Sequence, residues 1–474
     1  GTDGTDGTDG TGGTGGTDGT DGTDGPDGTD GTDGTDGTDG TDGTDGLTVS
    51  GDNPPAEQCD TASLNQWVYD SMLDYYLFYD QVPVVNPQSY DSPEALVQAI
   101  RFQERDPFSN VSNAAAQSLA FDEGREFGLG FRMGYDGDSI PRLAQVTREG
   151  PFGEVGLERG DILISVDGVA WSDLTIDEQF IEKIFGTPDS PGTAQWELQK
   201  RDSGDVVSFQ ITAAEYSINT VLHREILQNV NVNGTAVSGA IAYLAFSRFL
   251  ETSEQELVEA FDAFRAAGVS DLVLDLRYNG GGRVSIAMLL ASLIGGDSLA
   301  GQPMYEYRFN DKYADQNFSL DFLSDVGDLG LSRIVVLTTD RTASASEAII
   351  GGLQPYMDVV TMGRTTAGKS YIQIPDVRCD KALNAIIAEA FNASDQSVYG
   401  GIAPSCSAAD DLTRDFGTAA TGAVEGMYGA ALQYLVNGRC DAPLTIAQDR
   451  SGHQVIWHGE TARGGAFVKS APAN

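Results

Sequence analysis

The sequence predicts an α/β protein in which a β-rich module is inserted between an N-terminal helical segment and a core of βαβ units. Two observations support this fold class: short β-rich runs fill residues 126–215, and strand-like runs alternate with helical patterns after about residue 236. Such alternation favours parallel βαβ units. We therefore expect a linker (1–50), a helical segment (51–125), the β-rich module (126–215), the core (216–440) and a C-terminal tail (441–474).

The first 46 residues are near-perfect Gly-Thr-Asp triplets without an apolar side chain to form a core. A segment of this kind cannot offset the entropy lost on ordering, so we predict a disordered acidic linker. Calcium binding is the alternative, because Asp and Gly alternate as in some calcium-binding repeats. Those repeats also need a recurring apolar residue, which this segment lacks.

Composition excludes several classes of function. The net charge is −43, and the thirteen Asp of the first 46 residues leave about −30 for the remainder, so we expect no nucleic-acid partner. The sequence has no run of 18 apolar residues, which argues against a membrane-spanning helix. The four cysteines lack CxxC spacing, so we expect no metal site and no cofactor. Disulfides in an exported protein are favoured over buried free thiols.

The helical segment begins with apolar residues at helical spacing from Leu64 to Tyr76. A second helix is expected over 92–102, where Ser92 can cap and Pro93 can occupy the first helical position. In the β-rich module, Asp167-Gly168 between apolar runs predicts a hairpin. In the core, Ser253 and Glu256 have the spacing of a capping box, which predicts a helix from about residue 253.

Three loops of the core each follow a predicted strand: 279–282 after 271–276, 342–346 after 333–339, and 365–370 after 358–363. Parallel strands joined by right-handed crossovers bring these loops to one edge of the sheet. That edge then holds a glycine-rich turn, several hydroxyls at the start of a helix, and Lys369.

This set of residues fits acyl transfer. A serine needs a group that removes its proton, and the three histidines, His223, His453 and His458, all lie outside the three loops. A buried lysine can do this work because desolvation lowers its pKa, so a dyad of a loop serine with Lys369 is the economical interpretation. Glycines 280–282 can turn backbone N–H groups toward an oxyanion.

The same motifs resemble a known family. The runs "DLVLDLRYNGGG" (271–282), "TASASEAIIGGLQPY" (342–356) and "GRTTAGKSYIQ" (363–373) resemble the S41 carboxyl-terminal processing peptidases, or tail-specific proteases. The runs "FGLGFRM" and "GPFGEVGLERGDILISVDG" (150–168) resemble their PDZ domain. The resemblance covers roughly residues 60–440. It implies a core of the ClpP/crotonase-like type with an inserted PDZ domain.

The resemblance also implies roles for single residues. Ser344 matches the nucleophile, Lys369 the general base, and Gln373 the glutamine that orients the lysine in some members of the family. The oxyanion donors would be the N–H groups of Ala345 and of Gly280 or Gly281. Ser346 is interpreted as a structural hydroxyl of the helix start.

In the PDZ-like part, the carboxylate-binding loop would be Gly128, Leu129, Gly130 and Phe131. Its backbone N–H groups would capture a C-terminal carboxylate while the peptide adds a strand to the sheet. The partners implied are protein or peptide substrates with free C-termini. The expected location is the bacterial periplasm, or the outer membrane through a lipid anchor upstream of Gly1.

The cysteines allow three pairings. We expect Cys379 and Cys406 to form a local disulfide that closes the insertion 377–406, and Cys59 to pair with Cys440 because domain termini often meet. The insertion itself carries no recognisable chemical motif.

The sequence thus favours an exported serine endopeptidase that works by a Ser-Lys(-Gln) mechanism. Two alternatives stay open. One is a catalytically idle peptide-binding protein on the same fold, and the other is a Ser-Lys esterase.

Overall fold

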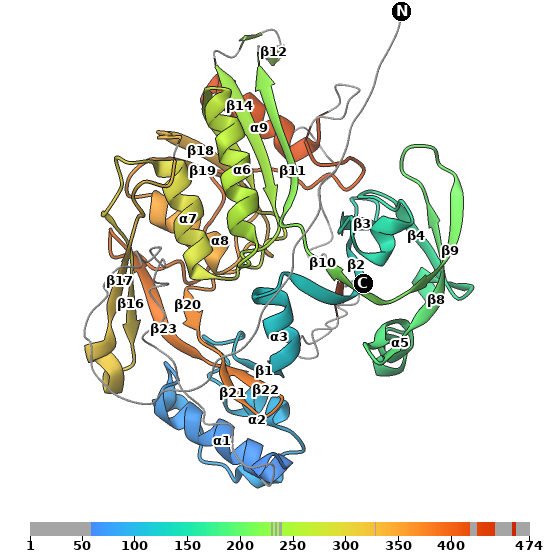
Figure 1. Ribbon diagram of the computed structural model, residues 1–474, viewed down its shortest axis with the longest axis vertical. Helices are drawn as coiled ribbons and strands as arrows, with labels where there is room; N and C mark the ends of the chain where they lie inside the picture. The colour runs from blue at the N-terminus through green and yellow to red at the C-terminus, as the bar shows by residue number, and fades with distance from the viewer. Residues whose placement is uncertain are drawn as a thin grey trace, which may run out of the picture. The chain divides into compact units, whose positions relative to one another are not determined.

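The computed structural model describes residues 58–228, 231–232, 235–236, 239–327, 329–417, 424–440 and 457–460. The predicted Gly-Thr-Asp linker and most of the predicted tail lie outside the described residues. Both interpretations of the linker, a disordered segment or a calcium-binding segment, therefore concern residues that the structure does not describe. Figure 1 shows the described chain with a helical N-terminal part, a β-rich module and a larger α/β part.

The N-terminal part packs its helices on a small antiparallel sheet, in which β1 pairs with β22 (Lys381–Asn384) and β22 pairs with β21 (Asp376–Arg378). Asp60 caps the first helix by accepting from Ser63 N at 3.0 Å. Ser92 caps the second by accepting from Ala95 N at 3.1 Å, as predicted. Pro93 is the first residue of that second helix, also as predicted. The elements are α1 (Thr61–Asp74), η2 (Tyr79–Gln81), η3 (Pro87–Ser89), α2 (Pro93–Ile100), β1 (Asn110–Asn113) and α3 (Ala114–Phe121).

The β-rich module is built on antiparallel strands in the order β10-β2-β3-β4-β8-β9. Its core centres on Phe131, whose ring stacks on Phe152 with centroids 4.1 Å apart, and on Trp196. The hairpin predicted at Asp167-Gly168 is confirmed, because Val166 pairs with Val169. The elements are β2 (Arg125–Tyr135), β3 (Pro141–Val146), α4 (Pro151–Glu154), β4 (Ile162–Val166), β5 (Val169–Ala170), η4 (Trp171–Asp173), α5 (Glu178–Phe185), β6 (Gly186–Thr187), β7 (Ser190–Pro191), β8 (Thr193–Gln199), β9 (Val206–Thr212) and β10 (Ala214–Ser217).

The α/β part contains a six-stranded sheet of order β11-β14-β15-β18-β19-β24, in which the strands from β14 to β24 are parallel. The strands of this sheet are β11 (Val221–Gln228), β14 (Ala240–Phe246), β15 (Val269–Asp275), β18 (Arg333–Thr338), β19 (Asp358–Gly363) and β24 (Cys406–Ser407). The helices that accompany it are α6 (Ser253–Ala266), α7 (Val284–Gly295), α8 (Ala345–Leu353) and α9 (Gly426–Asn437). The other elements are β12 (Asn231–Val232), β13 (Thr235–Ala236), β16 (Pro303–Phe309), η5 (Asp311–Gln316), β17 (Phe318–Asp321), β20 (Tyr371–Gln373), β21 (Asp376–Arg378), β22 (Lys381–Asn384), β23 (Ile386–Asn392) and β25 (Trp457–Glu460).

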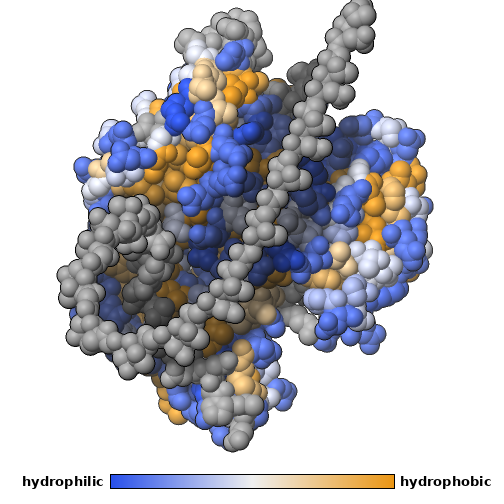
Figure 2. All heavy atoms as spheres, viewed as in Figure 1, coloured by the Kyte–Doolittle hydropathy of each residue, from blue (hydrophilic) through white to orange (hydrophobic). Residues whose placement is uncertain are grey.

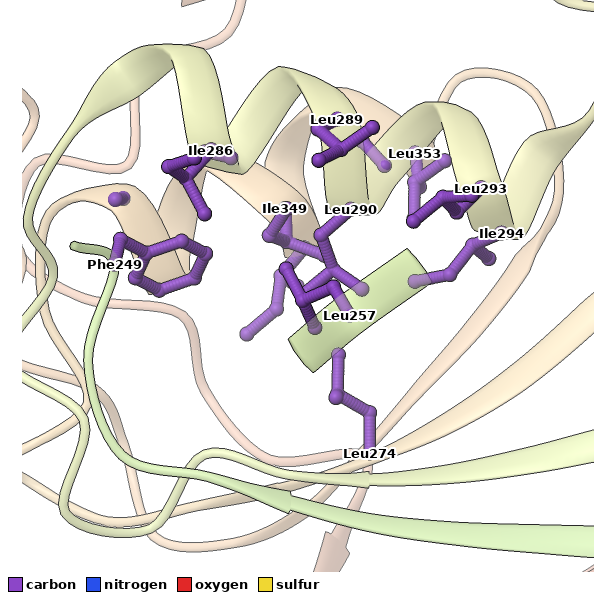
Figure 3. Packing of buried hydrophobic residues seen from close by; sticks show 14 of the residues in the cluster. Phe249, Leu257, Leu274, Ile286, Leu289, Leu290, Leu293, Ile294, Ile349 and Leu353 are labelled. Carbon is purple, nitrogen blue, oxygen red and sulfur yellow. The ribbon is translucent and has the colours of Figure 1, made fainter. Parts of the chain in front are cut away.

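Both faces of this sheet are covered, which is why its strands are continuous apolar runs. All seven residues of β14 are buried. One face packs on α6, α7 and α8, where Leu257, Leu290 and Ile349 meet Leu274 of β15 (Figure 3). The opposite face packs on α9. Two layers of helices thereby hold the central strands, and the loops that follow them, in place.

The capping box predicted at the start of α6 is wrong. Thr252 occupies the N-cap position without a side-chain hydrogen bond, and Ser253 is the first helical residue. Glu256 instead accepts from Thr220 N at 3.1 Å and Val221 N at 2.8 Å. These amides lie at the entry to β11, so the carboxylate satisfies donors of the neighbouring strand and not those of its own helix.

The disulfide pairing expected from the sequence is also wrong. The bonds join Cys59 to Cys379 and Cys406 to Cys440, with Cα atoms 6.0 and 5.5 Å apart. The reason is that the two ends of the segment 377–406 belong to different sheets. Cys379 lies in the turn between β21 and β22, beside the N-terminal part, whereas Cys406 lies in β24 of the six-stranded sheet.

None of the described helices has the length and apolar character needed to cross a membrane. Hydrophilic residues cover much of the described surface on the face seen in Figure 2, and hydrophobic residues form smaller patches on it.

Candidate active site

The three loops predicted to converge do meet at the carboxyl edge of the six-stranded sheet. Ala343 N donates to the carbonyl of Asn279 at 3.1 Å, which ties the second loop to the first. Ala367 N donates to the carbonyl of Thr342 at 2.9 Å, which ties the third loop to the second. The parallel order of β15, β18 and β19 is what places these loops side by side.

Two of the loop hydroxyls are structural. Thr342 Oγ1 donates to the carbonyl of Leu276 at 2.8 Å, and Ser346 Oγ donates to the carbonyl of Asn279 at 2.9 Å. Both residues are fully buried. Among the described residues, Ser344 Oγ makes no comparable hydrogen bond to the carbonyl groups of the first loop.

Ser344 stands immediately before α8 in a backbone conformation that non-glycine residues rarely adopt, with φ 56° and ψ −118°. Such a conformation costs about 1–3 kcal/mol and persists only where neighbouring contacts hold it. Ala345 begins the helix, and among the described residues its amide donates no hydrogen bond. This amide also lies at the positive end of the helix dipole, where a developing negative charge is stabilised.

Glu347 is the contact that holds the site together, and the sequence analysis gave it no role. Its buried carboxylate accepts from Ser344 N at 2.9 Å and from Lys369 N at 2.8 Å. It also accepts from Gly368 N at 2.6 Å and Thr366 Oγ1 at 2.5 Å. Burial raises the pKa of this carboxyl, and these hydrogen bonds oppose that shift. One side chain therefore joins the serine loop to the lysine loop.

The glycine-rich turn approaches Ser344 closely. A Cβ atom on Gly281 would lie 2.7 Å from Ser344 Cβ and 3.0 Å from Ala345 N, so only glycine fits there. The Gly281 amide donates to Asn279 Oδ1 at 2.9 Å. Gly280 is exposed, and no hydrogen bond within the described residues uses its amide. Of the two expected glycines, Gly280 is the one that keeps a donor for a ligand.

Lys369 is half-buried and its amine donates to Gln373 Oε1. Burial lowers the pKa of Lys369 to about 8, although Asp106 and Glu347 act in the opposite direction. Within the described residues no hydrogen bond joins Ser344 Oγ to the Lys369 amine. The two residues are linked through Glu347, which binds the backbone amides of both.

Gln373 is oriented by parts of the chain that the sequence analysis left without a function. Its Nε2 donates to the carbonyl of Asn384 at 2.6 Å and to that of Phe108 at 3.3 Å. Asn384 ends β22 in the insertion 377–406, and Phe108 lies just before β1 in the N-terminal part. These two acceptors point the amide nitrogen away from the lysine, so the amide oxygen faces the lysine amine.

A buried cluster of charges supports the loop that leads to Gly280. Arg277 Nη1 lies 2.7 Å from Asp410 Oδ1 and 2.9 Å from Glu425 Oε1, and its Nε donates to Asp275 at 3.0 Å. Arg159 of the β-rich module reaches the same Asp410 at 2.7 Å. Arg277 is fully buried, so its position is held by these ion pairs.

The residues expected to bind a carboxylate, Gly128, Leu129, Gly130 and Phe131, lie in β2 of the β-rich module and are all buried. Gly130 has a positive φ of 74°, and a Cβ atom there would lie 2.8 Å from Gly150 Cα. At this glycine the strand changes partners: residues 125–128 pair with β10, and residues 131–135 pair with β3. These residues belong to β2 and not to the three loops of the core.

Comparison with known proteins gives the following matches. The family model for peptidase family S41 matches residues 240–407, and the model for the peptidase S41 N-terminal domain matches residues 63–110. The C-terminal processing peptidase of Tetradesmus obliquus chloroplasts is 26% identical over 60% of this chain and 60% of its own length. The carboxy-terminal processing protease CtpB of Bacillus subtilis (strain 168) is 25% identical over 59% of this chain and 55% of its own length.

Among solved structures, a candidate S41 protease from Bacteroides fragilis NCTC 9343 is 26% identical, with a TM-score of 0.56, and the match covers 71% of this chain and 88% of that one. The chain thus spans somewhat over half the length of the two curated relatives. The two family models match the N-terminal helices and the sheet that carries the three loops. By these sequence matches and the structural likeness, the matched parts of the chain, residues 63–110 and 240–407, belong to peptidase family S41.

Proposed function

We propose that this chain is a serine endopeptidase of the carboxyl-terminal processing type. Ser344 attacks a peptide carbonyl, and neutral Lys369 takes the serine proton and later returns it to the leaving amine. Water then hydrolyses the acyl-enzyme. The observation that carries the proposal is the Glu347 carboxylate, which binds the backbone amides of both Ser344 and Lys369 and so holds nucleophile and base in one unit.

The oxyanion of the tetrahedral intermediate is stabilised by two backbone amides, those of Gly280 and Ala345. Each amide lacks a hydrogen-bond acceptor within the described residues, and the close approach of Gly281 to Ala345 N brings the two donors together. A site of this kind acts most strongly when its donors are held rigidly before the charge develops. Gln373 keeps the lysine amine oriented through the Lys369 Nζ to Gln373 Oε1 hydrogen bond.

The β-rich module, residues 126–215, serves in this proposal as a PDZ domain for the C-terminal tails of substrates. Two features support this assignment: β2 pairs with β10 before Gly130 and with β3 after it, and Gly130 has a positive φ. If the carboxylate of a peptide binds at Gly130, the peptide can extend along residues 131–135 as an added strand. The two disulfides favour an exported protein, since such bonds persist in oxidising compartments.

The test is hydrolysis of fluorescein-labelled casein by the full chain and by Ser344→Ala. We expect the variant to lose at least about 1,000-fold in rate, as removal of a covalent nucleophile does in serine hydrolases. Ser319→Ala is the matched control, because it removes an exposed serine in β17 and should leave the rate unchanged. Unchanged hydrolysis by Ser344→Ala would overturn the assignment. Hydrolysis of a p-nitrophenyl ester without hydrolysis of casein would favour the esterase instead.

A further inference from the structure

The C-terminal part of the chain contributes a strand to the β-rich module. Residues 457–460 form β25, which pairs antiparallel with β2, as the dark-red segment beside β2 in Figure 1. In this pairing Trp457 lies opposite Met133, His458 opposite Arg132, and Glu460 opposite Gly128.

The register shows which edge of β2 is occupied. Arg132 pairs with Gln145 of β3 on one side and with residue 458 on the other, and Met133 likewise pairs with Leu143 and with residue 457. β25 therefore lies on the edge that β3 leaves open. An open strand edge presents unpaired N–H and C=O groups, and it accepts any extended segment that can supply matching groups.

The direction of β25 matters as much as its edge. A substrate tail whose carboxylate sits near Gly128 to Gly130 must extend along residues 131–135, so it runs antiparallel to β2 with its C-terminal end toward Gly128. β25 runs the same way, because residue 460 lies beside Gly128 and residue 457 beside Met133. The internal strand and an incoming tail would use the same backbone groups of β2.

We propose that the open edge of β2 is a peptide-docking edge whose resident occupant is the chain's own segment 457–460, which competes there with the tails of substrates. The competition with substrates rests on the proposed function, whereas the occupancy of the edge by this segment does not. Trp457, the first residue of β25, is of an aromatic type that favours extended structure.

The tether makes a short strand an effective competitor. Sixteen residues join Cys440, held by its disulfide to β24, to Trp457. A segment tethered by a short linker acts at an effective concentration on the order of 1 mM. A segment that binds with a dissociation constant of about 0.1 mM would then lower the apparent affinity for a free peptide about tenfold, because only the open fraction of molecules can bind it.

The experiment uses the full chain carrying Ser344→Ala, so that no hydrolysis interferes, and compares it with the same chain lacking residues 451–474. The probe is a fluorescein-labelled synthetic peptide with the sequence of residues 451–460, measured by fluorescence anisotropy. We expect the shortened chain to bind the probe about tenfold more tightly. Amide hydrogen exchange of residues 128–135 should also become faster in the shortened chain, because their partners are gone.

A point variant separates the strand from the rest of the tail. Gly459→Pro removes a backbone N–H and fixes φ inside β25, so it should reproduce the effect of the deletion. Gly464→Pro makes the same exchange outside β25 and should bind the probe as weakly as the unaltered chain. Equal binding by the full, shortened and Gly459→Pro chains, with unchanged exchange at residues 128–135, would overturn the inference.

The same experiment keeps the inference apart from the proposed function. Tighter probe binding by the shortened Ser344→Ala chain supports the inference even if the enzyme with Ser344 intact hydrolyses no casein, an outcome that would count only against the peptidase. If deletion accelerates casein hydrolysis by the active enzyme as well as probe binding, the segment competes with substrates. If deletion alters probe binding but not hydrolysis, competition with substrates is refuted and only occupancy of the edge remains.

Discussion

Replacing Glu347 with Gln tests the contact on which the site depends. The change turns one carboxylate oxygen into an NH2 group while keeping the size of the side chain. Oε1 holds Thr366 and Gly368, and Oε2 holds the amides of Ser344 and Lys369. Either orientation of the new amide keeps one pair of hydrogen bonds and sets a donor against the other pair.

The size of the effect follows from the backbone of Ser344. Its conformation, with φ at 56°, costs about 1–3 kcal/mol relative to an ordinary one. If the bond from Ser344 N to Glu347 is lost, this strain is released and the active conformer becomes the minor one by a factor of about 5 to 150. We expect kcat to fall by that factor. Losing two hydrogen bonds to a charged group should also lower the free energy of unfolding by about 3–6 kcal/mol.

Stopped assays with labelled casein give kcat, and urea titration gives the free energy of unfolding. Glu256→Gln is the matched control, because Glu256 also accepts from two backbone amides but lies on α6, away from the three loops. This control should lose stability and keep kcat. A Glu347→Gln variant with the unaltered kcat, or a Glu256→Gln variant with an equal loss of kcat, would refute the reasoning.

Four further results are expected. Burial lowers the pKa of Lys369 to about 8, and only the neutral amine accepts a proton. We therefore expect kcat/KM for casein to rise as the pH is raised through about 8, which gives the pH profile a rising limb. A flat profile of kcat/KM from pH 6 to 9.5 would contradict this. Gln373→Glu puts a carboxylate beside the amine, so the same limb should move to higher pH, and a limb that stays in place would mean that residue 373 does not touch the amine. Arg277→Met removes the cation paired with the buried Asp275 and Glu425, and urea titration should show a loss of about 3–5 kcal/mol in the free energy of unfolding. Replacing Cys59 and Cys379 together by Ser opens a bond with a sequence separation of 320 residues and should cost about 2–5 kcal/mol by the same titration, whereas unchanged stability would refute its structural role.

The part of the site predicted from the sequence was the part that follows from chain topology. Parallel strands end at the same edge, so the loops after β15, β18 and β19 could be placed together before any coordinates were known. Local chemistry also sufficed for Ser92 as the cap of α2 and for Asp167-Gly168 as a hairpin. In each case the interacting groups are near in sequence or are related by a general rule of sheets.

The residues that were missed act across long sequence separations. Asn384 and Phe108 orient Gln373 through their carbonyl groups, which any residue type could supply, so no side-chain pattern marks them. The disulfides depend on which sheet each end of the segment 377–406 joins, and spacing does not reveal this. Glu347 did leave a signal: an acidic residue three positions after Ser344, at the start of a helix, has the spacing of a capping box.

The charge balance around Lys369 bears on its proposed role as the base. Desolvation destabilises the ammonium form, but Asp106 and Glu347 stabilise it, and the net result is a pKa lowered only to about 8. Glu347 ties the lysine loop to the loop of Ser344, because it accepts from the backbone amides of both residues. Both carboxylate oxygens of Glu347 accept hydrogen bonds from backbone amides, and one of them also accepts from Thr366 Oγ1. Glu347 therefore contacts Lys369 at its backbone N–H, whereas the Lys369 amine donates to the neutral Gln373. This arrangement limits how far Glu347 raises the pKa of the amine. In the proposed mechanism, a neutral amide at position 373 leaves the lysine pKa low enough for a base. A carboxylate at this position would stabilise the ammonium form, which is why it should move the pH limb upward.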